Sequence, residues 1–468
     1  MPTVFGASSD SSNLDIPTSL LFNRGHDNKL TFTPSSAGPT AERQKFTVSC
    51  WVKRCNLGDA ATQYLWEMGG ADAATTRFIC RFDANDNLNV NDSSTAFRIT
   101  GRRFRDVSAW YHIVVAVDTT QGTAGDRIKV YVNGVQETVF STSNNPGQND
   151  QKGFSHNSIH TIGRSSVDDT LSFDGYMANF DAVGGAQLTP SNFGKTDTNG
   201  QWIPIKYTGS FGTNGFKLEF KQTGTSANSS GMGADTSGND NHFAIGGDPN
   251  FTSSKIVPDT PTNNWANLNG VGATDSQGST GTLSSGNLVM GTGHKAQGLT
   301  IDNVMLDGGK WYFEVLLVTS SSLNTTIGFR NSDNGDDTPS IEIENDGQIK
   351  KNGSNQGSTD TAFSNGMVVG VLLDWSGAPS DRRISFETNN SAHSEGQQTF
   401  SVGSQGYHYH GRETGSGASH IYNFGQNGAF FGNLSAGNNA DGNGLGNFKY
   451  AVPSNHFAIC SKNLATEV

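Results

Sequence analysis

The chain of 468 residues is long enough for two to four domains of about 100–200 residues each. Charged residues make up 16% of it, against about 25% in an average soluble domain, which excludes disorder of the highly charged kind. The formal net charge of −12 would repel a phosphate backbone, so nucleic acid is excluded as a partner.

The first half of the chain alternates apolar and polar residues with the two-residue period of a β-strand. This pattern runs over 46–52, 110–118 and 127–132. Asn133 and Gly134 follow the third run, and this pair favours a tight hairpin because both turn positions need positive φ. Helical periodicity is nearly absent, so the alternation predicts a β-sandwich.

The hydrophobic density falls between about 212 and 285, where Gly, Ser, Asn and Thr surround isolated aromatic residues such as Phe243, Phe251 and Trp265. We interpret 213–282 as an irregular connector that these aromatic residues pin. Strand patterns return over 310–318, 326–329, 341–344, 367–374 and 382–387. The prediction is an all-β chain with an N-terminal attachment arm at 1–18, a β-sandwich at 19–212, the connector, and a second β-sandwich at 283–468.

Cysteine spacing and hydropathy indicate the cellular compartment in which the chain would fold. The four cysteines lack the paired spacing of a zinc site, so we expect reduced thiols and assembly in the cytosol; they are Cys50, Cys55, Cys80 and Cys460. The sequence contains no run of about 18 apolar residues and no signal-peptide pattern. Membrane insertion and conventional secretion are therefore not expected.

Ordered sets of segments resemble known domains. In the first half they are SLLFN (19–23), FTVSCWVKR (46–54), SAWYHIVVAVD (108–118), IKVYVNG (128–134) and FDGYMANF (173–180). In this order they resemble a laminin-G-like jelly roll of the concanavalin A type. In the second half, the segments are GKWYFEV (309–315), IGF (327–329), GVLLD (370–374), ISF (384–386) and YNFGQ (422–426). They resemble a SPRY-type sandwich, so the resemblance implies two jelly-roll β-sandwiches.

Three further segments extend the resemblance, namely DTSGNDNH (235–242), DTPTN (259–263) and FKYAVP (448–453). With the two sandwiches in this order, the chain is similar to virion structural proteins of marine tailed bacteriophages. The resemblance implies synthesis in the host cytoplasm, a place on the particle surface beside other virion proteins, and many copies or a homo-oligomer. Three functions stay open: a tail-fibre or appendage adhesin that binds host-surface glycan or protein, a purely structural capsid decoration, head-fibre or tail-knob protein, and a glycan depolymerase.

One loop is a candidate calcium site. Asp83, Asn85, Asp86 and Asn87 place oxygen ligands at close spacing, and laminin-G-like domains often carry calcium near their loop rim. The segment lacks the glycine and the distal glutamate of the helix-loop-helix calcium pattern, and Asp and Asn are also ordinary turn residues. Calcium is one interpretation and a plain turn is the other; no other cofactor is expected.

Two aromatic groups in the second half are candidate ligand-binding sites. The first is the run Tyr407, His408, Tyr409 and His410. In an extended chain its tyrosines would share one face and suit sugar rings, whereas the alternative is a surface loop with tyrosines packed on the sandwich. The second is Asp374 and Trp375 at the end of an apolar strand, where Trp375 either binds ligand at the rim or caps the core.

Catalytic machinery is hard to find in the sequence. The alternating acidic triplet Glu342, Glu344 and Asp346 is followed by Lys350 and Lys351 on the next expected strand. This pattern favours a solvated hairpin with cross-strand charge pairing over the carboxylate pair of a glycosidase. The sequence has no nucleophile elbow, phosphate-binding loop or zinc-protease motif. We therefore expect a protein that is not an enzyme.

Overall fold

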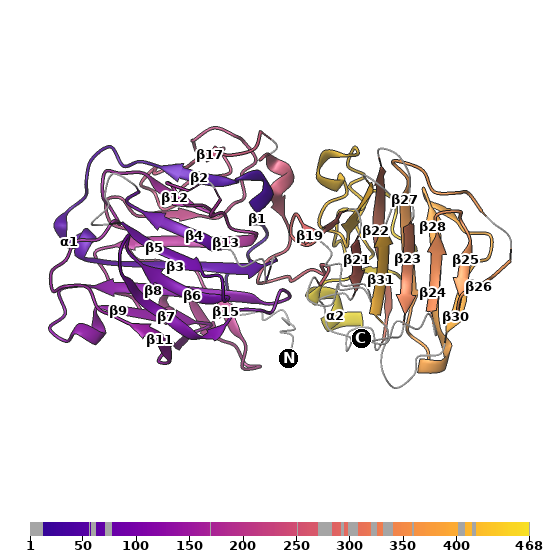
Figure 1. The fold of residues 1–468 in the computed structure, drawn as a ribbon, viewed down its shortest axis with the longest axis horizontal. Helices are drawn as coiled ribbons and strands as arrows, with labels where there is room; N and C mark the ends of the chain where they lie inside the picture. The colour runs from indigo at the N-terminus through magenta and orange to yellow at the C-terminus, as the bar shows by residue number, and fades with distance from the viewer. Residues whose placement is uncertain are drawn as a thin grey trace. The chain divides into compact units, whose positions relative to one another are not determined.

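The computed structural model describes residues 13–55, 57, 62–70, 77–168, 170–249, 251–269, 283–291, 294–297, 308–319, 325–330, 340–357, 360–400, 408–413 and 418–467. These residues form two compact units, the first ending at Thr262 and the second beginning at Asn263. Strands dominate both units (Figure 1), and the described α-helices are α1 (Thr40–Gln44) and α2 (Ser461–Glu467). The predicted all-β fold class is confirmed. No described helix has the length and apolar character needed to cross a membrane.

Two antiparallel sheets build the first unit. The β3 sheet has the order β10 (Val135–Gln136), β9 (Ile128–Val132), β8 (Trp110–Asp118), β3 (Lys45–Arg54), β13 (Gly175–Gly184), β1 (Ser19–Phe22) and β18 (Ile256–Val257), with β16 (Phe216–Leu218) also paired to β13. The β5 sheet has the order β11 (Phe140–Ser143), β7 (Ala96–Arg103), β6 (Asn87–Asn91), β5 (Phe78–Phe82), β4 (Gln63–Met68), β12 (His160–Ile162), β2 (Lys29–Phe32) and β17 (Ala244–Gly246). A separate hairpin joins β14 (Gly194–Thr196) to β15 (Trp202–Pro204).

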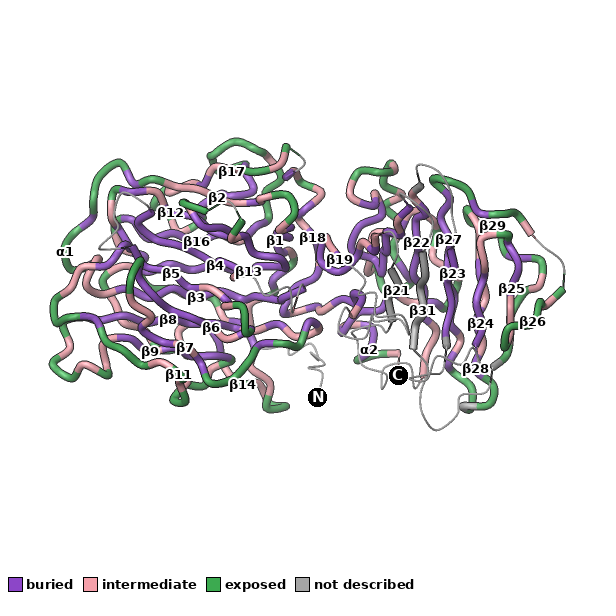
Figure 2. The backbone as a smooth tube through the Cα atoms, viewed as in Figure 1, coloured by how far each residue is buried: buried purple, intermediate pink, exposed green. Residues whose placement is uncertain are grey.

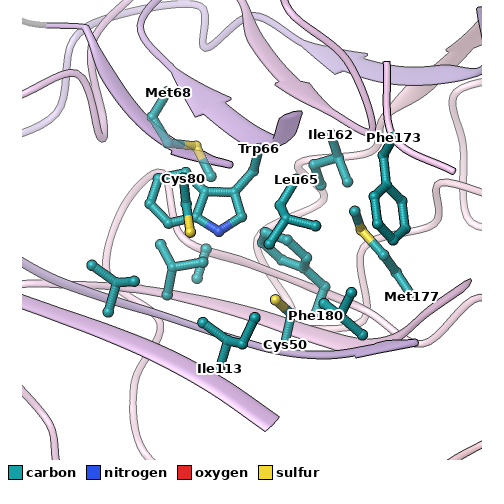
Figure 3. Close-up of a cluster of buried hydrophobic side chains, with 14 of the residues drawn as sticks. Cys50, Leu65, Trp66, Met68, Cys80, Ile113, Ile162, Phe173, Met177 and Phe180 are labelled. Carbon is teal, nitrogen blue, oxygen red and sulfur yellow. The ribbon is translucent and has the colours of Figure 1, made fainter. Parts of the chain in front are cut away.

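The core of the first unit lies between these two sheets. The alternation over 46–52 predicts its β3 face correctly, and the strands are largely buried (Figure 2). Cys50 from the β3 sheet meets Trp66 and Cys80 from the β5 sheet in one apolar cluster (Figure 3). Burial raises the pKa of the Cys50 and Cys80 thiols, so both cysteines serve as small apolar side chains.

The predicted hairpin at Asn133 and Gly134 is confirmed. Both residues have positive φ, at 48° and 81°, and they connect β9 to β10. A Cβ atom at Gly134 would lie 2.5 Å from ring atoms of Trp202. Glycine is therefore required here by the backbone conformation and by the close approach of the indole.

Residues 213–262 differ from the predicted connector, because they are part of the first unit. The strand β16 pairs with β13, while β17 and β18 are edge strands. Phe243 and Phe251 are buried in the core. The sequence does not predict this structure, because side-chain hydrogen bonds order the loops between the short strands and such bonds leave no hydrophobic pattern.

The first and last described residues of the first unit contact each other. Residues 1–12 of the predicted arm lie outside the described residues. Ile16 is buried, and its N–H donates to Thr262 Oγ1 at 3.1 Å. The predicted arm therefore packs against the first unit at least from Ile16 onward.

A buried ion pair holds the last segment of the first unit. Lys53 Nζ lies 2.8 Å from Asp259 Oδ2, and both side chains are fully buried. Trp110 Nε1 donates to Asp259 Oδ1 at 3.1 Å. The Ser19 hydroxyl donates to the Asp259 carbonyl oxygen at 2.6 Å. Asp259, which follows β18, thereby connects β1, β3 and β8.

The second unit is also a sandwich of two sheets. The larger has the order β19 (Leu283–Ser284), β20 (Val289–Met290), β32 (Ala418–Asn423), β22 (Lys310–Thr319), β27 (Val368–Asp374), β28 (Arg382–Thr388) and β29 (Ser391–Ala392), with β30 (Gln398–Phe400) on β28 and β33 (Phe457–Ala458) on β22. The smaller has the order β21 (His294–Gln297), β31 (His408–Glu413), β23 (Thr325–Arg330), β24 (Ser340–Glu344), β25 (Ile349–Lys351) and β26 (Ser354–Asn355). Trp265, expected to anchor a connector, bridges to Cys460 in this unit.

Asp259→Ala is expected to destabilise the first unit by about 3–5 kcal/mol, because it leaves the Lys53 ammonium buried without its carboxylate. Hydrogen–deuterium exchange of the full chain should show faster opening of β3 and β8, with the strands of the second unit as an internal reference. The matched control is Glu219→Ala, which breaks the half-exposed pair with Lys221 at 3.3 Å and should cost at most about 1 kcal/mol. Equal exchange in the two variants would contradict the structural role of Asp259.

Candidate functional site

The candidate calcium loop is a closed turn between β5 and β6. Asp83 Oδ1 accepts the backbone N–H groups of Asn85 at 2.9 Å and Asn87 at 3.0 Å. The Asn87 amide donates to the carbonyl oxygens of Thr100 and Arg102. These side chains are occupied in ordering the loop, as expected of a plain Asp/Asn turn.

Asp86, the remaining candidate ligand of that loop, is paired with two arginine side chains. Asp86 is 4% exposed, and its Oδ1 lies 3.0 Å from Arg54 Nη1 while its Oδ2 lies 2.7 Å from Arg105 Nε. Two guanidinium groups beside one carboxylate repel a divalent cation. Among the described residues, no three His, Cys, Asp or Glu side chains form a metal site. The residues of this loop therefore do not fit calcium.

The two predicted ligand sites of the second half have different outcomes. Trp375 is 2% exposed and contacts Phe329 and the Arg382 guanidinium in the core of the second unit. This placement favours the core-capping interpretation over ligand binding. Asp374 Oδ2 is paired with Lys310 Nζ at 2.9 Å, and its Oδ1 accepts the Ser376 hydroxyl at 2.6 Å.

The Tyr-His run is only partly described. Tyr407 lies outside the described residues. His408, Tyr409 and His410 begin β31, a strand paired with both β21 and β23. The extended conformation assumed for this run is present from His408 onward, and its ligand-binding role stays a prediction.

The acidic hairpin follows the charge-pairing interpretation at one of its glutamates. Glu344 Oε2 lies 2.6 Å from Lys350 Nζ. Glu342 is 2% exposed, so it is buried, whereas the sequence predicts a solvated side chain. Ile341 and Ile343 point into the core. The exposed carboxylate pair that a glycosidase requires is not formed by these two side chains.

Sequence reasoning missed the outward face of the β5 sheet. Leu88 and Val90 of β6 are in the core, so alternation places Asn89 and Asn91 on the opposite face. Asn89 lies directly opposite Arg81 of β5, and Asn91 lies opposite Ile79. Despite facing outward, Asn89 is 4% exposed and Asn91 is 7% exposed.

The same face continues across β4 and β12. Arg81 Nη1 donates to Tyr64 Oη at 3.1 Å, and the guanidinium lies 5.4 Å from the Tyr64 ring centre. In the neighbouring row, Thr161 of β12 is opposite Glu67 of β4. Arg77 binds both oxygens of Glu67, at 2.7 and 2.8 Å, so the acidic group on this face is neutralised.

Several polar atoms on this face lack partners. On this face, the buried side-chain atoms without a hydrogen-bond partner in the described part of the chain include Asn89 Oδ1, Asn91 Oδ1, Thr161 Oγ1 and Arg81 Nε. Buried polar groups in folded proteins are nearly always paired, so these atoms are exceptions. They are inaccessible from outside the protein, because the neighbouring side chains of this face, such as Ile79 and Tyr64, are buried as well. The repeated Asn-apolar-Asn pattern of 87–91 was the available signal in the sequence.

A serine–histidine pair on the β3 sheet tests for hydrolase chemistry. His112 Nε2 lies 2.8 Å from Ser49 Oγ, and Trp202 Nε1 lies 2.9 Å from His112 Nδ1. Because an indole N–H can only donate, Nδ1 is the acceptor and Nε2 carries the proton. His112 therefore donates to Ser49 and cannot take its proton as a general base. Burial also lowers the pKa of His112 to about 3.

Comparison with protein families matches residues 24–192 to the concanavalin A-like lectin/glucanases superfamily through its Laminin_G_3 model. No curated protein matches the chain in sequence. The first unit is thus a concanavalin A-like β-sandwich, as the sequence segments predict.

Solved structures similar to the chain include a heptameric SAP-like pentraxin of Limulus polyphemus, with 15% identity, 38% of this chain and 80% of that chain covered, and a TM-score of 0.27. Domains LG4-5 of the mouse laminin alpha1 chain align with 9% identity over 89% of this chain and 90% of that chain, with a TM-score of 0.30. The SPRY domain of human HERC1 aligns with 17% identity over 29% of this chain and 87% of that chain, with a TM-score of 0.23. A SPRY domain is thus among the solved structures similar to this chain.

His112→Gln is expected to flatten the pH dependence of stability below neutrality. The unfolded chain binds a proton near pH 6.5 that folded His112 takes up only near pH 3, so the histidine lowers stability as pH falls through this range. The wild-type free energy of unfolding should fall more steeply than that of the variant by about 1.4 kcal/mol per pH unit between pH 6 and 4.5.

Urea denaturation at each pH measures this slope. Ser49→Ala serves as the control, since it removes a hydrogen-bond partner and keeps the buried histidine, and it should retain the wild-type slope. A His112→Gln slope equal to wild type would show that His112 is protonated in the folded state.

Proposed function

We propose that the chain is a binding protein without catalytic activity on the surface of a tailed-bacteriophage particle, where it attaches the particle to host-surface glycan or protein. The observation that carries the binding role is the two-sheet β-sandwich of the first unit, built around one apolar core. The match of residues 24–192 to a lectin-containing superfamily supports a ligand-binding fold. The order of the sequence segments supports the particle location.

The geometry of the described acidic and nucleophilic groups supports binding over hydrolysis. Glu344 is paired with Lys350, and Glu342 is buried on its strand. The Ser49 hydroxyl oxygen accepts a hydrogen bond from His112 Nε2, so His112 does not activate it as a base. These contacts argue against the depolymerase alternative at the acidic hairpin that the sequence offered and at the serine–histidine pair that the structure adds.

Display of many copies on one particle would compensate for a binding site of low affinity. Many copies on one particle, or a homo-oligomer beside other virion proteins, raise the effective concentration of each site after the first has bound. Weak single-site binding is therefore compatible with firm attachment. A purely structural role needs no site of this kind.

The purified full-length protein is expected to bind cells of the host and to reduce phage adsorption when added before infection. Flow cytometry with labelled protein and plating of unadsorbed phage measure the two effects. Heat-denatured protein is the control. Failure to bind host cells would contradict the adhesin role. Reducing ends released from host polysaccharide would contradict the absence of catalysis.

A further inference from the structure

Three polar side chains meet between two neighbouring strands of the β3 sheet. Asp181 of β13 lies directly opposite Lys217 of β16 in the antiparallel pairing. Lys217 Nζ donates to Asp181 Oδ1 at 3.1 Å and to Asn179 Oδ1 at 2.9 Å. The Asn179 amide in turn donates to Asp181 Oδ2 at 2.8 Å. An amine, a carboxamide and a carboxyl group therefore form one closed ring of hydrogen bonds.

A bulge in β13 places the asparagine in this ring. The pairing of β13 with β3 shifts its register between Ala178 and Asp181, and Asn179 adopts a positive φ of 43° there. Met177 and Phe180 both belong to the core although they are three residues apart, which shows the extra residue of the bulge. Such backbone conformations are uncommon outside glycine and gather at functional sites. The backbone is therefore arranged to hold the amide of Asn179 against the lysine.

The three side chains are shielded from water. Asn179, Asp181 and Lys217 are 3%, 0% and 4% exposed. Val183, which shares a face of β13 with Asp181, packs among aromatic side chains in an apolar cluster. Burial raises the pKa of the Asp181 carboxyl despite the neighbouring lysine, and Glu219 acts in the same direction. Burial thus favours passage of a proton from the ammonium to the carboxylate, because a neutral amine and a neutral acid cost less to bury than two ions.

An amine, an amide and a proton-transfer group are the parts that a self-catalysed amide exchange requires. Once Lys217 has passed a proton to Asp181, the lone pair of Nζ can attack Asn179 Cγ, the carbon bonded to the contacting Oδ1. The Nζ–Cγ bond forms and the Cγ–Nδ2 bond breaks. Asp181 gives its proton to the leaving nitrogen, with which it is already hydrogen-bonded, and takes one from Nζ. One ammonia leaves, and the reaction consumes no oxidant, metal or second reactant.

We propose that the first unit cross-links itself through an isopeptide bond between Lys217 Nζ and Asn179 Cγ, with Asp181 as the proton-transfer residue. The bond joins positions 38 residues apart and anchors β16, a strand of three residues, to β13. A cross-link of this kind restricts the unfolded chain, as a disulfide does. The reaction occurs once in each chain, so it adds no turnover activity, and it does not depend on the proposed binding function.

Mass spectrometry of the denatured full-length protein tests the bond. Wild type is expected to be lighter than its sequence by one ammonia, and a tryptic digest should yield one branched peptide that contains both Asn179 and Lys217. A succinimide at an asparagine–glycine pair loses the same mass but leaves the two peptides separate, so the digest identifies the bond. Lys217→Arg should have the full sequence mass. Lys221→Arg, at a half-exposed lysine near the same strand, is the matched control and should keep the branched peptide.

Asp181→Asn tests the proton transfer, because asparagine keeps the shape of the aspartate but cannot exchange protons in this way. This variant is expected to show a wild-type circular dichroism spectrum and no branched peptide. A wild-type mass equal to the sequence, or separate peptides for Asn179 and Lys217, would overturn the inference and leave a buried ion pair only. A branched peptide at full yield in Asp181→Asn would overturn the role of Asp181. The wild-type digest decides the bond even where a variant does not fold.

Discussion

Buried carboxylates hold the irregular parts of this chain in place. Asp235 Oδ1 accepts backbone N–H groups from Lys217 and Ser237, and its Oδ2 accepts that of Asn241. In the second unit, Glu314 is fully buried on β22, and its oxygens accept the N–H groups of Lys449 and Tyr450. Burial raises the pKa of Glu314, while the donated hydrogen bonds favour its charged form.

Asp441 repeats this arrangement near the end of the chain. Its Oδ1 accepts the N–H groups of Asn443 and Leu445, and its Oδ2 accepts the N–H of Ala458 and the amide of Asn463. In each case a single carboxylate takes up several orphan backbone donors of a glycine-rich loop, which otherwise would need regular strand pairing. A chain with few charges can therefore fix long loops, because the acidic side chains are placed where loops need acceptors.

This mechanism decides what the sequence could predict. Alternation is a property of strands with one buried face, so the inward face at Cys50 and the hairpin at Asn133 and Gly134 followed directly from the pattern. Residues 213–262 follow no such period, and their order depends on contacts such as those of Asp235, which no local pattern shows. Strand alternation likewise gave the faces of Glu342 and Glu344 but not their burial, because burial depends on what covers the sheet.

The predicted site residues show the same limit of prediction from sequence. The Asp83 loop and Trp375 drew notice because their residue types are common in binding sites, yet both are explained by local turns and core packing. Asn89 and Asn91 drew none, although their alternation with Leu88 and Val90 fixes the face on which they lie. What distinguishes them is that the buried Oδ1 atom of each accepts no hydrogen bond within the described structure, which only the assembled sheet reveals.

Unpaired acceptors on a rigid sheet have a cost that the rest of the first unit must offset. Each costs about 1–3 kcal/mol, which is large against a typical net stability of about 5–15 kcal/mol for a domain. The apolar core between the two sheets, which contains Trp66, supplies the burial that offsets this cost. Because Asn89 and Asn91 are buried, water cannot satisfy their Oδ1 atoms, and the folded state bears the full cost of leaving them unpaired.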